Sequence, residues 1–162
     1  MKKLYLLSSL LVLSFNAHSQ GGQTYLIKQK GCQFGAEIVA AFAVQIENTV
    51  SEIVSKTEPN SSARKKQYQD VVDSSQRMID KVYLETKRKK EEQLNDPTNS
   101  SKSYYEKTSY EANLSIYYMS VVFAYEIGVA AALENASLNK KFSETRYLRH
   151  IESECLSVSD KK

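Results

Sequence analysis

Proline and glycine are scarce in this sequence, which holds 2 Pro and 5 Gly among 162 residues. Both residue types interrupt regular structure, so their scarcity favours long helices over short strands joined by tight turns. The chain also lacks alternating apolar and polar runs bounded by hairpin turns, and it has no internal repeat. Its length suits one domain with one hydrophobic core. We therefore expect a single all-α domain.

Histidine and the common catalytic motifs are nearly absent as well. The sequence contains no H-E-x-x-H, no glycine-rich phosphate loop and no paired-carboxylate motif. His18 lies in a segment that we expect to be removed, which leaves His150 for any Cys/His or Ser/His site and excludes a multi-histidine metal site. In RHIESECLS, residues 149–157, the simplest interpretation is a surface hydrogen bond between His150 and Glu154. We expect no catalytic residue, no metal and no cofactor, and the sequence leans against an enzyme.

The first residues have the layout of a targeting segment. Two lysines at the start precede an apolar run over residues 4–15, and small side chains come just before residue 20. The apolar run is shorter than the roughly 20 residues of a membrane-spanning helix. This pattern predicts a secretory signal peptide over residues 1–19, followed by a single helical domain over residues 20–162. We expect the protein in the periplasm or outside the cell.

Basic and acidic residues are nearly balanced in this sequence. Loss of the two leading lysines reduces 22 basic residues to 20, against 19 acidic ones. A nucleic-acid-binding protein needs a basic field that attracts phosphates, so we expect no nucleic-acid partner. The basic run KRKK at 87–90 is followed directly by Glu91 and Glu92, which is typical of a solvated helix face.

Four segments carry apolar residues every three or four positions. They run from Gly35 to about Thr57, from Ser61 or Ser62 to about Asn95, from about Ser103 to Ala136, and from about Lys140 to Val158. Short loops join them, so the sequence predicts an up-and-down four-helix bundle with a long central helical hairpin. The two middle segments are about ten residues longer than the others, so their shared tip is expected to project about 15 Å.

The only two cysteines lie near the two ends of the expected bundle. Cys32 precedes the first predicted helix and Cys155 lies near the end of the last one. In an up-and-down bundle these points fall at the same end, and an oxidising compartment then predicts one disulfide that ties the chain ends together. A bonded Cys155 is neither a nucleophile nor a metal ligand.

The third segment is unusually apolar, because Glu126 is the single charge between residues 112 and 133. By length this stretch is able to span a bilayer. The central charge, the tyrosines spread along it and the polar character of the other segments favour instead the most enclosed helix of a soluble bundle. Four small residues recur at every fourth position and predict close packing of a neighbouring helix: Ser120, Ala124, Gly128 and Ala132.

Glu126 itself needs partners if it is buried. An unpaired carboxylate in apolar surroundings costs several kcal/mol, so hydrogen-bonding or cationic neighbours are expected. The candidates are Arg146, Arg149, His150 and nearby tyrosine hydroxyls. One interpretation is a structural ion pair or an exposed helix edge, and the other is a contact with a ligand or partner.

The tip of the central hairpin is a candidate partner surface. It combines Arg88 with Tyr104 and Tyr105, and the segment over residues 23–31 is expected to lie near it. Tyrosine offers a large contact area with a polar end, which suits both a core and a recognition surface.

The layout of the chain resembles that of the small exported helical proteins that act as immunity factors against antibacterial type VI effectors. The likeness lies in an export signal, in GCQFGAEIVAAFA at 31–43 with its cysteine, and in HIESECLS at 150–157 with the second cysteine. It covers layout and no specific motif, and the long central hairpin departs from the family's compact pattern. It implies a non-catalytic binding or inhibitor protein whose partner is another protein of the cell envelope. An envelope structural or chaperone-like protein is the alternative, and the oligomeric state stays open.

Overall fold

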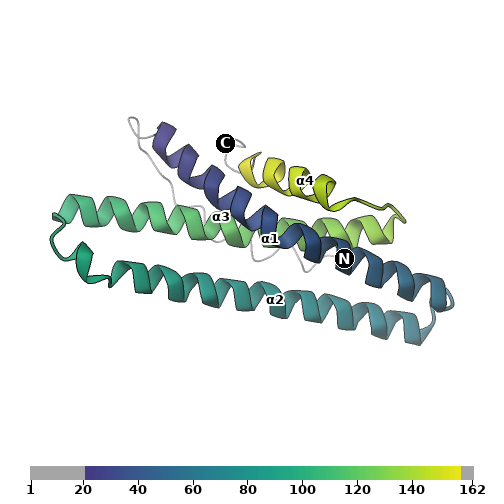
Figure 1. Cartoon of the computed structure of the whole chain (residues 1–162). Coiled ribbons are helices and arrows are strands. Elements are labelled where there is room, and N and C mark those ends of the chain that lie inside the picture. The colour runs from purple at the N-terminus through teal and green to yellow at the C-terminus, as the bar shows by residue number, and fades with distance from the viewer. Residues whose placement is uncertain (1–20, 158–162) are drawn as a thin grey trace.

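The computed structural model describes residues 21–157, so the predicted signal peptide and the last five residues lie outside the described chain. Four helices and one short 3-10 helix make up this part, without a strand between residues 21 and 157 (Figure 1). The elements are α1 (Gly21–Lys56), α2 (Ser62–Leu94), η1 (Pro97–Asn99), α3 (Tyr104–Ser137) and α4 (Glu144–Ser157). Successive helices run in opposite directions, which confirms the predicted up-and-down helical bundle.

Helix α1 starts earlier than predicted, at Gly21 instead of Gly35, so Cys32 lies within the helix and not before it. Gly35, the predicted helix start, lies inside α1. Glycine is needed at this position because a Cβ atom built there would lie 2.6 Å from the Cβ of Ala124. Gly31 is similarly confined, with the carbonyl oxygen of Tyr117 at 2.5 Å from such a Cβ. Both glycines therefore serve the close approach of α1 to α3.

The core lies mainly between α1 and α3, and α4 packs against both. The predicted strip of small residues on α3 makes this packing possible, since Ser120, Ala124, Gly128 and Ala132 are all buried. Gly128 faces α1 and α4 at once: a Cβ there would lie 2.9 Å from Val39 and 3.1 Å from Ile151. The expectation of a tightly packed neighbouring helix is confirmed.

Polar side chains fix the helix ends. Ser61 caps α2 by accepting a hydrogen bond from the backbone N–H of Arg64 at 3.2 Å. The Arg64 side chain in turn donates to the carbonyl oxygen of Val54 at 2.6 Å and to Thr57, at the end of α1. A cation at this position also opposes the negative end of the helix dipole. Ser103 and Glu106 form a capping box that starts α3.

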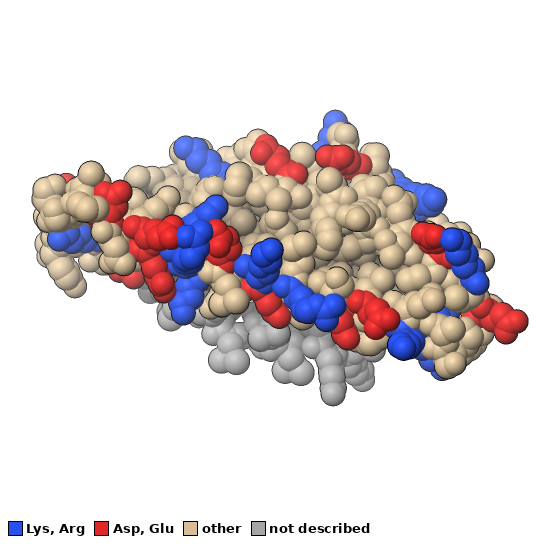
Figure 2. All heavy atoms as spheres, turned by 60° about the horizontal axis from the view of Figure 1, so that its bottom comes forward, with Lys and Arg blue, Asp and Glu red and all other residues tan. Residues whose placement is uncertain are grey.

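Helix α2 buries fewer of its residues than the other helices. Among its residues only Ser75 is buried. Five of its apolar or aromatic side chains are partly buried against the core: Tyr68, Val71, Val72, Ile79 and Val82. Figure 2 brings the α2 side of the molecule forward and shows basic and acidic side chains interleaved over it. Helix α3, by contrast, holds most of the buried residues of the core.

The tip of the α2–α3 hairpin lies at the same end of the bundle as the start of α1 and the end of α4 (Figure 1). The predicted reason for its projection was wrong, because α1 has 36 residues against 33 in α2 and 34 in α3. The tip is separate from α1 because the first turns of α1, before Gly31, diverge from α3 (Figure 1). Residues 23–31 form these turns, and Gly31 at their end already lies against α3.

Candidate functional site

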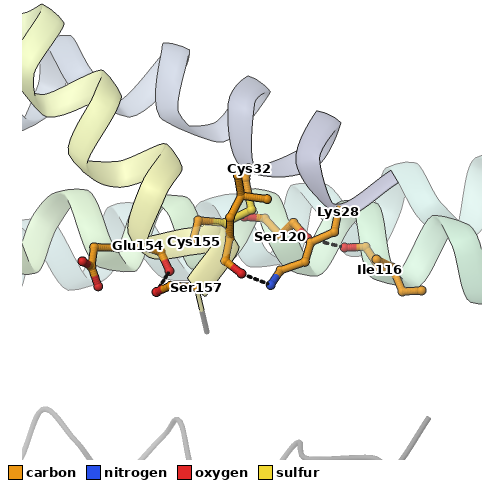
Figure 3. Close-up of a disulfide and its surroundings, with 8 residues drawn as sticks. Lys28, Cys32, Ile116, Ser120, Glu154, Cys155 and Ser157 are labelled. Atoms are coloured by element: carbon orange, nitrogen blue, oxygen red, sulfur yellow. Dashed lines mark hydrogen bonds between the residues drawn. A yellow bond between two sulfur atoms is a disulfide. The ribbon is translucent and has the colours of Figure 1, made fainter. Parts of the chain in front are cut away.

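The two cysteines form the predicted disulfide, which ties α1 to α4. The Cys32 and Cys155 sulfur atoms are 2.06 Å apart and the Cα atoms 5.7 Å apart. Next to it, Lys28 of α1 donates a hydrogen bond to the carbonyl oxygen of Leu156 at 2.8 Å (Figure 3). Both sulfur atoms are buried and bonded, so neither is available as a nucleophile or a metal ligand.

A long concave surface lies between α1, α2 and α3. It has a volume of about 780 Å³ and is partly open to solvent. We call it the α1–α2–α3 groove. Its apolar and aromatic lining consists of Phe34, Ile38, Met78, Val82, Leu114, Tyr117, Tyr118, Val121 and Tyr125. Tyrosine hydroxyl groups are uncharged at neutral pH, and burial raises the pKa of Tyr117, Tyr118 and Tyr125 further.

The charged side of the groove belongs to α2. Lys81, Glu85, Lys89 and Glu92 line it at helical spacing. Arg88 is hydrogen-bonded to the carboxylates of both Glu85 and Glu92, one turn away on either side. The Arg88 hydrogen bond holds the pKa of Glu85 below its ordinary value. Arg88, a predicted partner-surface residue, thus already forms ion pairs within its own helix.

The other two predicted partner-surface residues are the most exposed of the large hydrophobic side chains in the described chain. Tyr104 is 78% exposed and Tyr105 is 84% exposed, and their rings meet edge to face at 5.9 Å. The ammonium group of Lys102 lies 3.8 Å from the centre of the nearby Tyr110 ring. The tip of the hairpin therefore presents aromatic rings to solvent beside a cation.

The predicted polar set around Glu126 does not assemble. The Arg146 guanidinium lies 3.8 Å above the Phe142 ring, and His150 meets the same ring edge-on at 6.2 Å. Arg149 is exposed. Glu126 is half-buried on α3, and it has no ion pair or hydrogen bond with any of residues 21–157. Burial raises the pKa of its carboxyl group.

A buried polar cluster that was not predicted from the sequence lies at the junction of α1, α3 and α4. Its central residue, Glu47 of α1, is only 1% exposed. Its carboxyl group accepts hydrogen bonds from the Tyr147 hydroxyl at 2.5 Å and from the Phe142 backbone N–H at 3.2 Å. Asn135 donates to the Tyr147 oxygen at 3.2 Å. The cluster is fully hydrogen-bonded, which favours a structural role.

A signal for this cluster was present in the sequence. Glu47 lies four residues after Ala43 and three before Val50, on the apolar stripe of α1. A carboxyl group on such a stripe predicts a buried hydrogen-bond partner. Tyr147 lies four residues before Ile151 on the buried stripe of α4, where its hydroxyl reaches Glu47.

Two further properties of the described chain bear on the type of site. Between residues 21 and 157, no group of three His, Cys, Asp or Glu side chains is placed to hold a metal ion. Two helices, Gly22–Lys56 and Tyr104–Ser137, are long and apolar enough to cross a membrane by length and composition alone. Half of the most apolar window in the second is buried inside the bundle, as in the core helix of a soluble protein.

Comparison of the sequence with protein-family models and with curated proteins, and of the structure with solved structures, gives no significant match. The candidate site therefore depends on the geometry of the chain itself. Two neighbouring features define it: the α1–α2–α3 groove and the exposed tyrosines at the hairpin tip.

Proposed function

We propose that this protein is an exported helical binding protein of the inhibitor or immunity type, which acts through a protein–protein surface and not through catalysis. The surface is the end of the bundle that carries the disulfide, the groove and the hairpin tip. Its partner is another protein of the cell envelope.

The observation that carries this proposal is the grouping of exposed apolar side chains at that end. Tyrosine, phenylalanine, leucine and isoleucine side chains there are about half exposed or more: Tyr25, Leu26, Phe34, Ile38, Tyr83, Leu84, Tyr104 and Tyr105. Grouped exposed apolar residues mark interaction sites, and tyrosine is enriched among the residues that dominate binding energy. The buried disulfide supports export, because such bonds persist in oxidising compartments.

The test is cross-linking in the cell envelope of the native host, followed by mass-spectrometric identification of the captured protein. The triple variant Arg88→Ala, Tyr104→Ala, Tyr105→Ala removes the exposed tip. A matched control, Val54→Ala with Leu138→Ala, removes exposed apolar side chains outside this surface. We expect one captured protein to be lost with the triple variant and retained with the control.

Equal capture by both variants would contradict a partner surface at the tip. The envelope chaperone-like alternative makes a different prediction, namely that the purified chain suppresses the aggregation of many unrelated unfolded proteins. Light scattering during the refolding of two or three unrelated clients separates these two functions.

A further inference from the structure

The α1–α2–α3 groove has helices on three sides. Phe34 and Ile38 of α1, Met78 and Val82 of α2, and Tyr117 of α3 all contribute to its lining. The remaining helix, α4, packs against α1 and α3 and contributes no lining residue. In helical bundles an apolar seam between helices is normally covered by a further helix. No helix of the described chain covers this one.

The dimensions of the groove suit a helix. Its lining runs from Met78 to Gln93 on α2 and from Leu114 to Tyr125 on α3. At about 1.5 Å per residue these stretches measure about 22 Å and about 16 Å, or three to four helical turns. Sites for small molecules bury most of the ligand surface in a closed cleft. A groove that is partly open along helices is the form that receives the apolar face of an amphipathic helix.

The charges along the groove define what that helix must carry. The carboxylates of Glu85 and Glu92 are both bound by Arg88. The hydrogen bond from Arg88 lowers the pKa of Glu85. Lys81 and Lys89, which also line the groove, lower this pKa further through their charge but make no direct salt bridge within the described chain. They are eight residues apart on α2, which places them about 12 Å apart along its axis. An incoming helix with acidic side chains at a matching spacing would complement them.

We propose that the α1–α2–α3 groove binds an amphipathic helix of the partner protein, with acidic residues seven or eight positions apart that lie opposite Lys81 and Lys89. The apolar stripe of this helix packs on Phe34, Val82 and Tyr117. The inference rests on the proposed function and specifies the chemistry of the partner.

Two other occupants of the groove would come from this protein itself, namely residues 1–19 and a helix of a second copy. Both complement Lys81 and Lys89 less well than an acidic helix does. Residues 1–19 contain two lysines and no acidic residue, so they offer nothing to Lys81 and Lys89. In a second copy, most apolar side chains of α1, α3 and α4 pack into that copy's own core, and the exposed Phe34 and Ile38 of α1 line its own groove. The remaining helix, α2, carries the basic run at 87–90, which would meet the lysines of the groove with like charge.

The experiment places the photo-cross-linking residue p-benzoylphenylalanine in the full chain, in the native host, at Ile38 in one strain and at Tyr105 in another. Ile38 lines the groove and Tyr105 lies at the tip, and both side chains are exposed enough to be replaced without loss of the fold. Mass spectrometry then identifies the captured protein and the segment of it that is joined to the probe.

The expected result is that Ile38 captures a partner through an amphipathic helix whose acidic residues are seven or eight positions apart. A synthetic peptide of that helix should bind the purified protein about tenfold more weakly after Lys81→Glu with Lys89→Glu. The matched control, Lys65→Glu with Lys66→Glu, makes the same charge change at exposed positions of α2 outside the groove. Binding to the control should be unchanged.

The remaining outcomes overturn the proposal, and they separate it from the proposed function. Capture at Tyr105 without capture at Ile38 leaves the partner surface standing and removes the groove. Capture at Ile38 of a second copy, of residues 1–19, or of a segment without the acidic pair assigns the groove to another occupant. A peptide whose affinity is unchanged by the Lys81 and Lys89 substitutions, or equally weakened by the control, also rejects the groove. No protein captured at either position rejects both proposals.

Discussion

The hydrogen bond from Tyr147 to Glu47 is the main polar link between α1 and α4 away from the disulfide. Burial and this hydrogen bond raise the pKa of the Tyr147 hydroxyl, which therefore remains a donor at neutral and mildly alkaline pH. Tyr147→Phe leaves the buried Glu47 carboxyl group and the Asn135 amide each without one partner. We expect a loss of about 2 kcal/mol in the free energy of unfolding, measured by urea denaturation.

Tyr105→Phe is the matched control for this variant, because it removes the same hydroxyl from an exposed ring. It should change the free energy of unfolding by less than about 0.5 kcal/mol. A Tyr147→Phe protein as stable as this control would show that the buried cluster contributes no net stability.

Glu126 predicts a pH dependence of stability with a definite sign. Burial raises the pKa of its carboxyl group in the folded state above 4.5, so the folded protein holds this proton more tightly than the unfolded chain. The contribution of the group to stability is therefore complete below about pH 4 and is lost as the pH rises through the raised pKa. Glu126→Gln keeps the side chain neutral, so this variant should melt at a higher temperature than the wild-type protein at about pH 7.

Thermal unfolding at about pH 4 and about pH 7 provides the measurement, and the gain should shrink towards the acidic pH. Glu134→Gln, at an exposed position of the same helix, is the control and should gain little. An equal gain for both variants, or a gain that grows towards acidic pH, would disprove the assignment to burial.

For single residues, the sequence predicts those contacts that depend on residue type. It does not predict contacts that depend on the orientation of a side chain. The disulfide was predictable because only Cys32 and Cys155 were present and the topology placed them together. The lack of pairing between Glu126 and Arg146 was not, because the Arg146 guanidinium lies over the Phe142 ring instead. Side-chain orientation of this kind follows from packing details that a helical period does not contain.

The close contact between α1 and α3 depends on the absence of a side chain at Gly31. A Cβ at position 31 would lie 2.5 Å from the Tyr117 carbonyl oxygen and 2.8 Å from the Ser120 Cβ. Backbone cannot move aside as a side-chain end can, so Gly31→Ala should force the helices apart. We expect a loss of about 1–3 kcal/mol in the free energy of unfolding, measured by chemical denaturation.

Gly22→Ala is the matched control in the same helix, since nothing lies within 4 Å of the Cβ that it would add. Alanine is the better helix former, so this variant should be unchanged or more stable by up to about 1 kcal/mol. If the two variants behaved alike, the close approach at Gly31 would not govern the packing of α1 on α3.

The number, type and order of the helices were predictable from apolar periodicity, whereas the start of α1 was not. Gly31 and Gly35 interrupt the pattern and suggest a helix boundary, yet both lie in the helix because α3 requires small residues there. A single sequence does not show this use of glycine, since it depends on which helix passes nearby. The α1–α2–α3 groove escaped prediction for the same reason: it depends on how three helices lie relative to one another.

For the whole molecule, the disulfide should supply a large part of the stability. It joins residues 123 positions apart and so restricts nearly the entire unfolded chain. On the chain-entropy model, Cys32→Ala with Cys155→Ala should lower the free energy of unfolding by roughly 4–5 kcal/mol. Urea denaturation of the wild-type protein, with and without a reductant, gives an independent measure of the same difference.

In this comparison the reduced wild-type protein and the double variant should unfold at similar urea concentrations. The oxidised protein should also show no thiol that reacts with a thiol reagent after denaturation. A midpoint that does not move with reductant, or two reactive thiols without it, would contradict the cross-link.

The disulfide also distinguishes α2 from the other helices. It joins α1 to α4 over the small-residue strip of α3, and these three helices share the buried core. Helix α2 is connected to this core by two turns and partly buried side chains. We therefore expect the α2 wall of the α1–α2–α3 groove to move more readily than its aromatic floor on α3, so that the groove can widen for a helix with larger side chains.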